Sequence, residues 1–319
     1  MQARAGSAFS GVLDALGPPC LTANVGWRMH TFMAKQTIGD NMCRAVLSLA
    51  MLIVASATVL SRADVQEPSM PPSHTDRAIA PSLAASGEDS RAVALIQAGA
   101  LDEAITNLSR AIQLNPTSAT AILYRACAYR AKGAFEQSLQ DWDHYIQLNP
   151  TNDFAYKSRA SLYNVTGRFD SAIKDWNEGL RLTPADATAL AMRGFAYSKT
   201  GQYQKALNDF TEALRLEPDN HSAHNSLAWL RATCPDPALR DGSQAVHEAT
   251  KACELTSRTN WTRVDTLAAA FAEAGQFKKA VAAQRRAIRM TGPSTDDLRR
   301  MHERLSLYQH GKPFHEGQR

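Results

Sequence analysis

Hydrophobic and polar positions follow a helical period on both sides of Gly201. The small or apolar residues that recur every three or four positions are Leu190, Gly194 and Tyr197 before this glycine and Ala206, Phe210 and Ala213 after it. Residues with this spacing share one face of an α-helix. Pro218 follows the second block, and proline does not continue a helix. Residues 187–220 are therefore predicted to form two antiparallel helices joined by a short turn.

The same hairpin pattern recurs along the chain at an interval of 34 residues. Prolines keep this interval at Pro116, Pro150, Pro184 and Pro218, and turn glycines keep it at Gly99, Gly133, Gly167 and Gly201. Self-similarity with a period of about 20–50 residues is typical of solenoids, in which each unit buries its apolar face against its neighbours. We therefore expect an all-α array of stacked hairpins.

The unit ATALAMRGFAYSKTGQYQKALNDFTEALRLEPDN resembles the tetratricopeptide repeat (TPR). The resemblance implies a right-handed superhelical solenoid of about six helix-turn-helix repeats with a C-terminal capping helix. It divides the chain into four TPR units at 85–220, two variant units at 221–293, and a capping helix with a tail at 294–319. The capping helix is expected near Thr295–Tyr308, with Ser294 as its N-cap.

Three arginines of the central units precede an aspartate by sixteen residues: the pairs are Arg125 and Asp141, Arg159 and Asp175, and Arg193 and Asp209. Each pair is centred on the turn glycine of its unit. Residues equidistant from the turn of an antiparallel hairpin lie at one level, so each guanidinium can reach the carboxylate on the second helix. We predict a ladder of structural ion pairs in preference to an anion-binding arginine stripe.

TPR proteins line one face of the solenoid with their first helices, and the resemblance places a partner-binding groove there. The residues of this chain at those positions are Arg130, Lys157, Ser161, Asn164, Phe195, Ser198, Lys199, Asn225 and Trp229. Their mixture of polar and aromatic side chains suits an extended peptide or a partner helix. The alternative interpretation is a solvated inner face with one tolerated aromatic residue. Trp142 and Trp176, in contrast, fall at the phase that packs between helices and are predicted to be core residues.

The amino-terminal part of the chain follows a different pattern. Residues 45–60 carry no charge, and as a helix they would span ~24 Å, which is short against the ~30 Å hydrocarbon core of a bilayer. Basic residues precede this run and small residues follow it, as in an export signal. We expect a leader with a signal peptide or signal anchor at 1–63 and a proline-rich disordered linker at 64–84. The chain would then be exported, and either periplasmic or anchored through 45–60 in the inner membrane, facing the periplasm.

Charge and motifs argue against nucleic-acid binding and catalysis. The 35 basic and 31 acidic residues give a formal net charge of only +4, too balanced for a phosphate-binding surface. No nucleophile elbow, metalloprotease, Walker or Cys-x-x-Cys motif is present, so we expect no enzyme activity and no cofactor. His221 and His224 lie three residues apart at a helix start, but the sequence specifies no further ligand near them. They are predicted to face solvent, with no metal site.

The pattern as a whole predicts a non-catalytic scaffold or adaptor of the cell envelope that binds a partner peptide or helix in the concave TPR groove. Two alternatives stay open, namely a membrane-anchored assembly factor and a regulatory subunit of an envelope enzyme. A third, ranked below these, is an enzyme site late in the chain, built from His302, His310, His315 and Glu316, whose positions share no convincing spacing.

Overall fold

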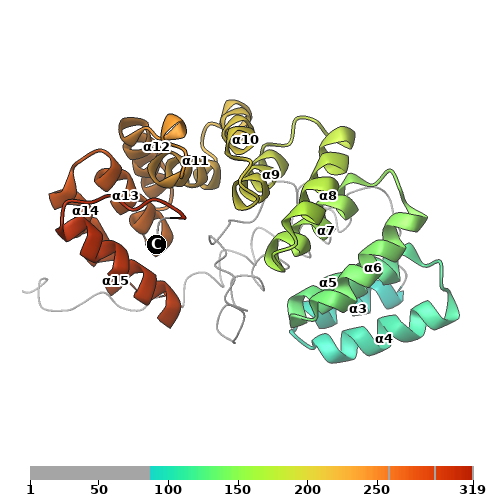
Figure 1. Ribbon diagram of the computed structural model, residues 1–319. Coiled ribbons are helices and arrows are strands. Elements are labelled where there is room, and N and C mark those ends of the chain that lie inside the picture. The colour runs from blue at the N-terminus through green and yellow to red at the C-terminus, as the bar shows by residue number, and fades with distance from the viewer. Residues whose placement is uncertain (1–86, 258, 291, 318–319) are drawn as a thin grey trace, which may run out of the picture. The chain divides into compact units, whose positions relative to one another are not determined.

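The computed structural model describes residues 87–257, 259–290 and 292–317. This part of the chain contains thirteen α-helices, one 3₁₀ helix at Pro237–Leu239 and no β-strand (Figure 1). The first twelve α-helices form six successive hairpins: α3 (Gly87–Gln97) with α4 (Leu101–Leu114), α5 (Ala119–Lys132) with α6 (Phe135–Leu148), α7 (Asp153–Val165) with α8 (Phe169–Leu182), α9 (Ala187–Lys199) with α10 (Tyr203–Leu216), α11 (His221–Thr233) with α12 (Gly242–Leu255), and α13 (Trp261–Glu273) with α14 (Phe277–Arg289). The last helix is α15 (Thr295–Gln309).

None of the helices in these ranges is both long and apolar enough to span a bilayer. The predicted export signal at 1–63, including the apolar run 45–60, and the predicted linker at 64–84 lie outside the described residues.

In five of the six hairpins, the first helix begins at a polar side chain that caps it. The caps of α5, α7, α9, α11 and α13, each accepting a hydrogen bond from a backbone N–H of the first turn, are Ser118, Asn152, Asp186, Asn220 and Asn260. These residue types satisfy N–H groups that have no partner inside the helix. Ser294 caps α15 in the same way, and Asp297 returns a bond to the Ser294 N–H. The predicted start of the capping helix is confirmed.

The turn inside each of the first four hairpins depends on glycine. Gly201, which follows the C-cap of α9, has a φ of +76°, and the next N–H, that of Gln202, bonds to the Tyr197 carbonyl. This left-handed conformation is strained for a residue that carries a Cβ. The other glycines of the 34-residue pattern adopt it too: Gly99, Gly133 and Gly167. The spacing of glycines in the sequence thus reflects a requirement of the backbone.

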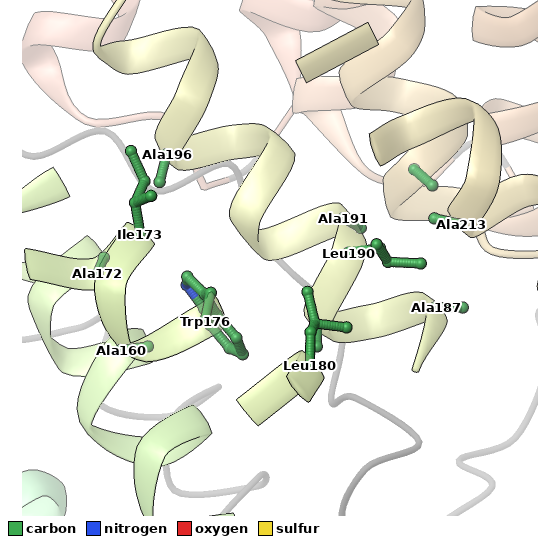
Figure 2. Packing of buried hydrophobic residues seen from close by; sticks show 12 residues of the cluster. Ala160, Ala172, Ile173, Trp176, Leu180, Ala187, Leu190, Ala191, Ala196 and Ala213 are labelled. Carbon is green, nitrogen blue, oxygen red and sulfur yellow. The ribbon is translucent and has the colours of Figure 1, made fainter. Parts of the chain in front are cut away.

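Neighbouring hairpins share an apolar core in which alanines surround a few large side chains. In one cluster, Trp176 and Leu180 of α8 pack among alanines of α7, α9 and α10 (Figure 2). Trp176 is 3% exposed and Trp142, one hairpin earlier, 1%, so both are core residues, as predicted. Small residues also let paired helices approach closely. A Cβ placed on Gly194 of α9 would lie 2.8 Å from the ring of Phe210 on α10.

The three arginine–aspartate pairs form two-bond ion pairs within their hairpins. The two nitrogen-to-oxygen distances are 2.9 and 2.7 Å for Arg125 and Asp141, 2.7 and 2.7 Å for Arg159 and Asp175, and 2.8 and 2.8 Å for Arg193 and Asp209. All three carboxylates are buried. The planar guanidinium matches a carboxylate in this geometry. Arg91, at the same phase of the first hairpin, instead makes an exposed 3.5 Å contact with Glu103.

The same three arginines also contact the preceding hairpin, which the sequence analysis did not predict. In each, Nη1 donates to the side chain sixteen positions earlier: Arg125 to Ser109 at 3.1 Å, Arg159 to Asp143 at 2.6 Å, and Arg193 to Asn177 at 2.9 Å. The ring of the tyrosine four residues later lies 5.7–6.0 Å from each guanidinium. The ladder therefore joins each of these three hairpins to the one before it, and its guanidinium groups are occupied by the protein's own side chains.

Candidate partner-binding pocket

A pocket of about 120 Å³ lies between α9, α11 and α13. Its aromatic lining residues are Phe195 from α9, Tyr203 and Phe210 from α10, Trp229 from α11 and Trp261 from α13. Sites for whole small molecules typically measure ~300–1,000 Å³. The volume therefore suits a single side chain of a larger ligand better than a free metabolite or an organic cofactor.

Five of the nine residues predicted for the groove line this pocket: Phe195, Ser198, Lys199, Asn225 and Trp229. The other four lie on α5 and α7 and do not line it: Arg130, Lys157, Ser161 and Asn164. An Arg130 Nη2 to Ser161 Oγ bond of 3.4 Å links those two helices. Asn164 is buried and donates to the Met192 carbonyl of α9 at 3.3 Å.

Lys157 does not present its charge to a groove, contrary to the prediction. Its Nζ lies 2.6 Å from a carboxylate oxygen of Asp153 and 2.6 Å from one of Asp186, and the residue is only 6% exposed. Position 157 shares the helical phase of Asn225, two repeats later, which made it look like a groove position. The ammonium is instead neutralised inside the fold, so Lys157 is a structural residue.

The rim of the pocket carries a cation beside an aromatic ring. Lys199 is exposed, and its Nζ lies 5.4 Å from the centre of the Phe195 ring. The same ring also packs against Phe169, which meets it edge to face with 6.0 Å between the ring centres. Phe195 is therefore a fixed apolar wall, and Lys199 can pair with a carboxylate of a ligand without leaving the ring.

The pocket also contains a buried acceptor that no described residue satisfies. Asn225 is 6% exposed, and its Oδ1 has no hydrogen-bond partner among the described residues. A buried amide oxygen without a donor costs ~1–3 kcal/mol. A ligand N–H would remove the cost once rotation of the Asn225 amide turned this buried oxygen toward the pocket. Asn225 thus favours a ligand with amide hydrogens, such as a peptide backbone.

The residues after α15 return to this face of the array, which the sequence analysis did not predict (Figure 1). We call Lys312–Gly317 the C-terminal segment. The backbone N–H of Glu316 donates to the Thr233 carbonyl of α11 at 2.8 Å, and the Trp229 indole N–H donates to the Glu316 carboxylate at 2.8 Å. The Phe314 ring lies 6.2 Å from the Trp229 ring. An aromatic residue in a short polar terminal stretch was the only sequence signal of this contact.

A buried ion pair fixes α15 close to the C-terminal segment. Arg304 Nη2 lies 2.8 and 3.0 Å from the two carboxylate oxygens of Asp265 on α13, and both residues are 4% exposed. Asp265 also accepts a 2.7 Å bond from Gln284 on α14. The Arg304 guanidinium lies 5.5 Å from the Trp229 ring and 5.6 Å from that of Phe314. Asp265 lines the pocket, but its charge is neutralised within the protein.

His224 is buried and His221 is half-buried, contrary to the prediction that both face solvent. The ring nitrogens of His224, a residue only 7% exposed, lie 2.5 Å from the Glu248 carboxylate and 2.8 Å from the Pro218 carbonyl. His221 Nδ1 lies 3.1 Å from Arg263 Nη2. Burial, together with the Arg263 charge, lowers the pKa of His221 to about 4. The two histidines have different partners, and no group of three metal-ligating side chains occurs in the part of the chain that the structure describes.

Three of the four side chains considered for a late enzyme site, those of His310, His315 and Glu316, have separate structural partners, and the fourth, His302, is exposed. His315 Nε2 lies 2.7 Å from Glu273, and His310 Nδ1 lies 2.8 Å from the carbonyl of Ser306. In the pocket itself, burial raises the pKa of the Cys234 thiol. The thiolate that a nucleophilic cysteine needs is therefore disfavoured there. The arrangement suits binding better than acid–base or nucleophilic chemistry.

The comparisons with known proteins agree with the repeat architecture. Residues 187–220 match the family model of the tetratricopeptide repeat. Among solved structures, the chain is similar to a tetratricopeptide repeat protein from Parabacteroides merdae ATCC 43184, with 20% identity over 70% of this chain and 86% of that chain and a TM-score of 0.59. It is also similar to PilW, a widely conserved type IV pilus biogenesis factor, with 14% identity over 70% of this chain and 100% of that chain and a TM-score of 0.58. No curated protein matches the sequence.

At these identities the likeness shows the fold. The repeat match identifies residues 187–220 as a tetratricopeptide repeat, and the six hairpins have the all-α repeat fold of TPR solenoids.

Proposed function

We propose that this chain is a non-catalytic scaffold that binds an extended segment of a partner protein in the pocket between α9, α11 and α13. The observation that carries the proposal is the buried Asn225 oxygen, which lacks a donor inside a pocket with aromatic walls. A peptide provides both an amide hydrogen for this oxygen and an apolar side chain for the space between Phe195 and Trp229. Lys199 at the rim suits an acidic residue of the same peptide.

The expected binding free energy of one side chain in the pocket and one hydrogen bond to Asn225 shows that these contacts are only part of the interface. Burying one large apolar side chain contributes ~1.5–3 kcal/mol, and satisfying the amide oxygen removes a cost of ~1–3 kcal/mol. A micromolar complex requires about 8 kcal/mol after the entropy of association is offset. The partner must therefore also contact neighbouring surface, and the Arg130 and Ser161 side chains on α5 and α7 are candidates for it.

The proposal is tested by affinity capture with the full chain as bait. We expect the double variant Lys199→Glu, Asn225→Ala to lose at least one partner by tenfold or more, as a loss of ~1.4 kcal/mol would produce. The matched control is Lys205→Glu, since Lys205 is an exposed lysine on α10 that does not line the pocket. Equal recovery of every co-purifying protein with native chain and double variant would contradict the proposal. A partner that is itself an enzyme would favour the regulatory-subunit alternative.

We also propose that the scaffold is exported and acts in the cell envelope. This part rests on the charge-free run at 45–60 with its basic upstream flank. Intact-mass measurement of the protein from its native cells tests it. A mature chain that begins near residue 64 supports a cleaved signal, and a full-length chain extracted only by detergent supports a membrane-anchored assembly factor. A full-length chain in the soluble cytoplasmic fraction would contradict export.

A further inference from the structure

The C-terminal segment contacts the first-helix face in the manner of a bound peptide. Phe314 and Glu316 both meet Trp229, whereas the intervening His315 reaches Glu273 on α13. Side chains that alternate in direction are typical of an extended chain. The N–H of Glu316 adds a main-chain bond to the Thr233 carbonyl. Ring packing, a charge-assisted side-chain bond and a main-chain bond are the contacts by which a groove holds an extended peptide.

This contact surface is continuous with the pocket. Trp229 belongs to both, because its indole N–H binds Glu316 while its ring is an aromatic wall of the pocket. Glu316 itself lines the pocket on one side. A segment that lies where the C-terminal segment lies, and extends further into the pocket, would therefore meet the Asn225 side chain, which also lines it.

We infer that the C-terminal segment is an internal occupant of the partner site, and that the partner carries the same chemistry: an extended stretch with an aromatic residue two positions before a carboxylate residue. The inference rests on the proposed function, to which it adds the chemistry of the partner and a competition between partner and segment. The aromatic residue of the partner replaces Phe314 against Trp229, and its carboxylate accepts the indole N–H in place of Glu316.

The contacts also explain how a partner can displace a tethered competitor. A tethered segment competes at an effective concentration on the order of millimolar. The C-terminal segment is only partly buried, with Lys312 and Gly317 exposed. It leaves the Asn225 oxygen without a donor. A partner that contacts the segment's position and also donates to Asn225 therefore gains an interaction that the segment does not make, and this difference drives the exchange.

The inference is tested with a peptide added to the full chain. The probe is the fluorescein-labelled nonapeptide GKPFHEGQR, which copies residues 311–319. The bait is the full-length double variant Phe314→Ala, Glu316→Ala, which keeps the chain length but removes the two contacts with Trp229. By fluorescence anisotropy, we expect the probe to bind this variant at least tenfold more tightly than the native chain. The matched control bait is Lys312→Ala, since Lys312 is exposed, and it should behave like the native chain.

A probe carrying the same two alanines should not bind the double variant. If the unsubstituted probe fails to bind a double variant that keeps its helical circular dichroism and melting temperature, the inference is wrong. Hydrogen–deuterium exchange on the native chain decides the matter if the double variant does not fold. The Glu316 amide should then exchange much faster than the amides of α13, because the segment detaches locally. If the Glu316 amide and the α13 amides both exchange only through global unfolding, the segment is a permanent part of the fold and the inference is wrong.

Two further outcomes separate this inference from the proposed function. In the first, a captured partner requires Lys199 and Asn225 for binding and yet binds the native chain and the Phe314→Ala, Glu316→Ala variant equally. This result would overturn the competition and leave the proposed function intact. A concentration-dependent dimer of the native chain that this variant does not form would assign the site to a second copy of the segment. That result would overturn the partner chemistry inferred here.

Discussion

Arg159 Nη1 lies 2.6 Å from a carboxylate oxygen of Asp143, which belongs to the preceding hairpin. The same guanidinium holds Asp175 of its own hairpin through two further bonds. In a repeat array, stability is approximately the sum of the stabilities of single repeats and the interactions between neighbours. One side chain therefore contributes to both quantities at this position. The rung at Arg159 therefore supports the stacking of two hairpins as well as the closure of one.

Removing this arginine should destabilise the array strongly. In Arg159→Ala, Asp175 would keep its buried position without a counter-charge. Burial already raises the pKa of Asp175 even with Arg159 present. Breaking a buried pair costs ~3–5 kcal/mol, and because the Arg159 side chain is 17% exposed we expect the lower end of that range. Urea denaturation followed by circular dichroism measures the loss.

The control for this variant is Arg181→Ala on α8. Arg181 pairs with Glu178 at 2.8 Å, but its side chain is 62% exposed. Exposed pairs contribute little to stability, because solvent screens them. If Arg159→Ala costs no more free energy of unfolding than Arg181→Ala, the ladder does not stabilise the array in the way described.

Gly194→Ala should also destabilise the protein, although alanine favours helices. The added Cβ would lie 2.8 and 3.0 Å from two ring carbons of Phe210 and 3.2 Å from the Cβ of Asp209. Overpacking of this kind costs ~1–3 kcal/mol, which exceeds the ~1 kcal/mol that alanine gains over glycine in a helix. Thermal unfolding should show a lower melting temperature.

A double-mutant cycle with Phe210→Leu identifies the cause of that loss. If the clash with the ring is responsible, Gly194→Ala should cost less in the Phe210→Leu background than in the native one. The same cost in both backgrounds would place the effect elsewhere, for instance in the backbone of α9.

The acid sensitivity of the protein should depend in part on His221. Its pKa of about 4 in the folded chain is lower than the ~6.5 of an unfolded histidine, because burial and the Arg263 charge oppose protonation. Between these two values the unfolded state binds more protons, so the stability that this group contributes is present above pH ~6.5 and is lost as the pH falls toward 4. His221→Gln, which still offers Arg263 an acceptor, should flatten the dependence of unfolding free energy on pH in that window. Denaturation series at several pH values measure the slope.

The exposed His302 offers the matching control for this pH experiment. His302→Gln should leave the slope as it is in the native chain. A slope in His221→Gln that equals the native slope would mean that other groups account for the acid sensitivity.

Features that depend on local residue types could be predicted from the sequence. The turn at Gly201 requires a left-handed backbone, and the start of α15 requires a cap such as Ser294. Each requirement restricts the residue type at one fixed position, which can be read in the sequence. The interpretations of Lys157 and His224 were wrong because their partners come from other elements. Asp186 lies 29 residues after Lys157, and Glu248 lies 24 residues after His224. The helical phase of a residue gives no information about contacts with such distant positions. For the same reason the return of the C-terminal segment to α11 was not predicted.

The two lysines predicted for the groove should give opposite phenotypes. Lys157→Met keeps most of the side-chain volume beside Gly179 but leaves Asp153 and Asp186 without their ammonium. Burial alone would raise the pKa of Asp153, yet hydrogen bonds from Lys157 and Thr183 outweigh it and hold this pKa below its usual value. Asp153 therefore contributes stability that is present at neutral pH and lost in acid, and Lys157→Met should forfeit it.

We accordingly expect Lys157→Met to lose ~3 kcal/mol of unfolding free energy at neutral pH in urea denaturation. The triple variant Asp153→Asn, Lys157→Met, Asp186→Asn should recover much of this loss, because it removes the unpaired charges while the amide introduced at position 186 can still cap α9. Lys199→Met should change stability by no more than ~0.5 kcal/mol, as is usual for an exposed position, and should instead weaken partner capture. Equal destabilisation by Lys157→Met and Lys199→Met would contradict the assignment of the first lysine to the fold and of the second to the pocket rim.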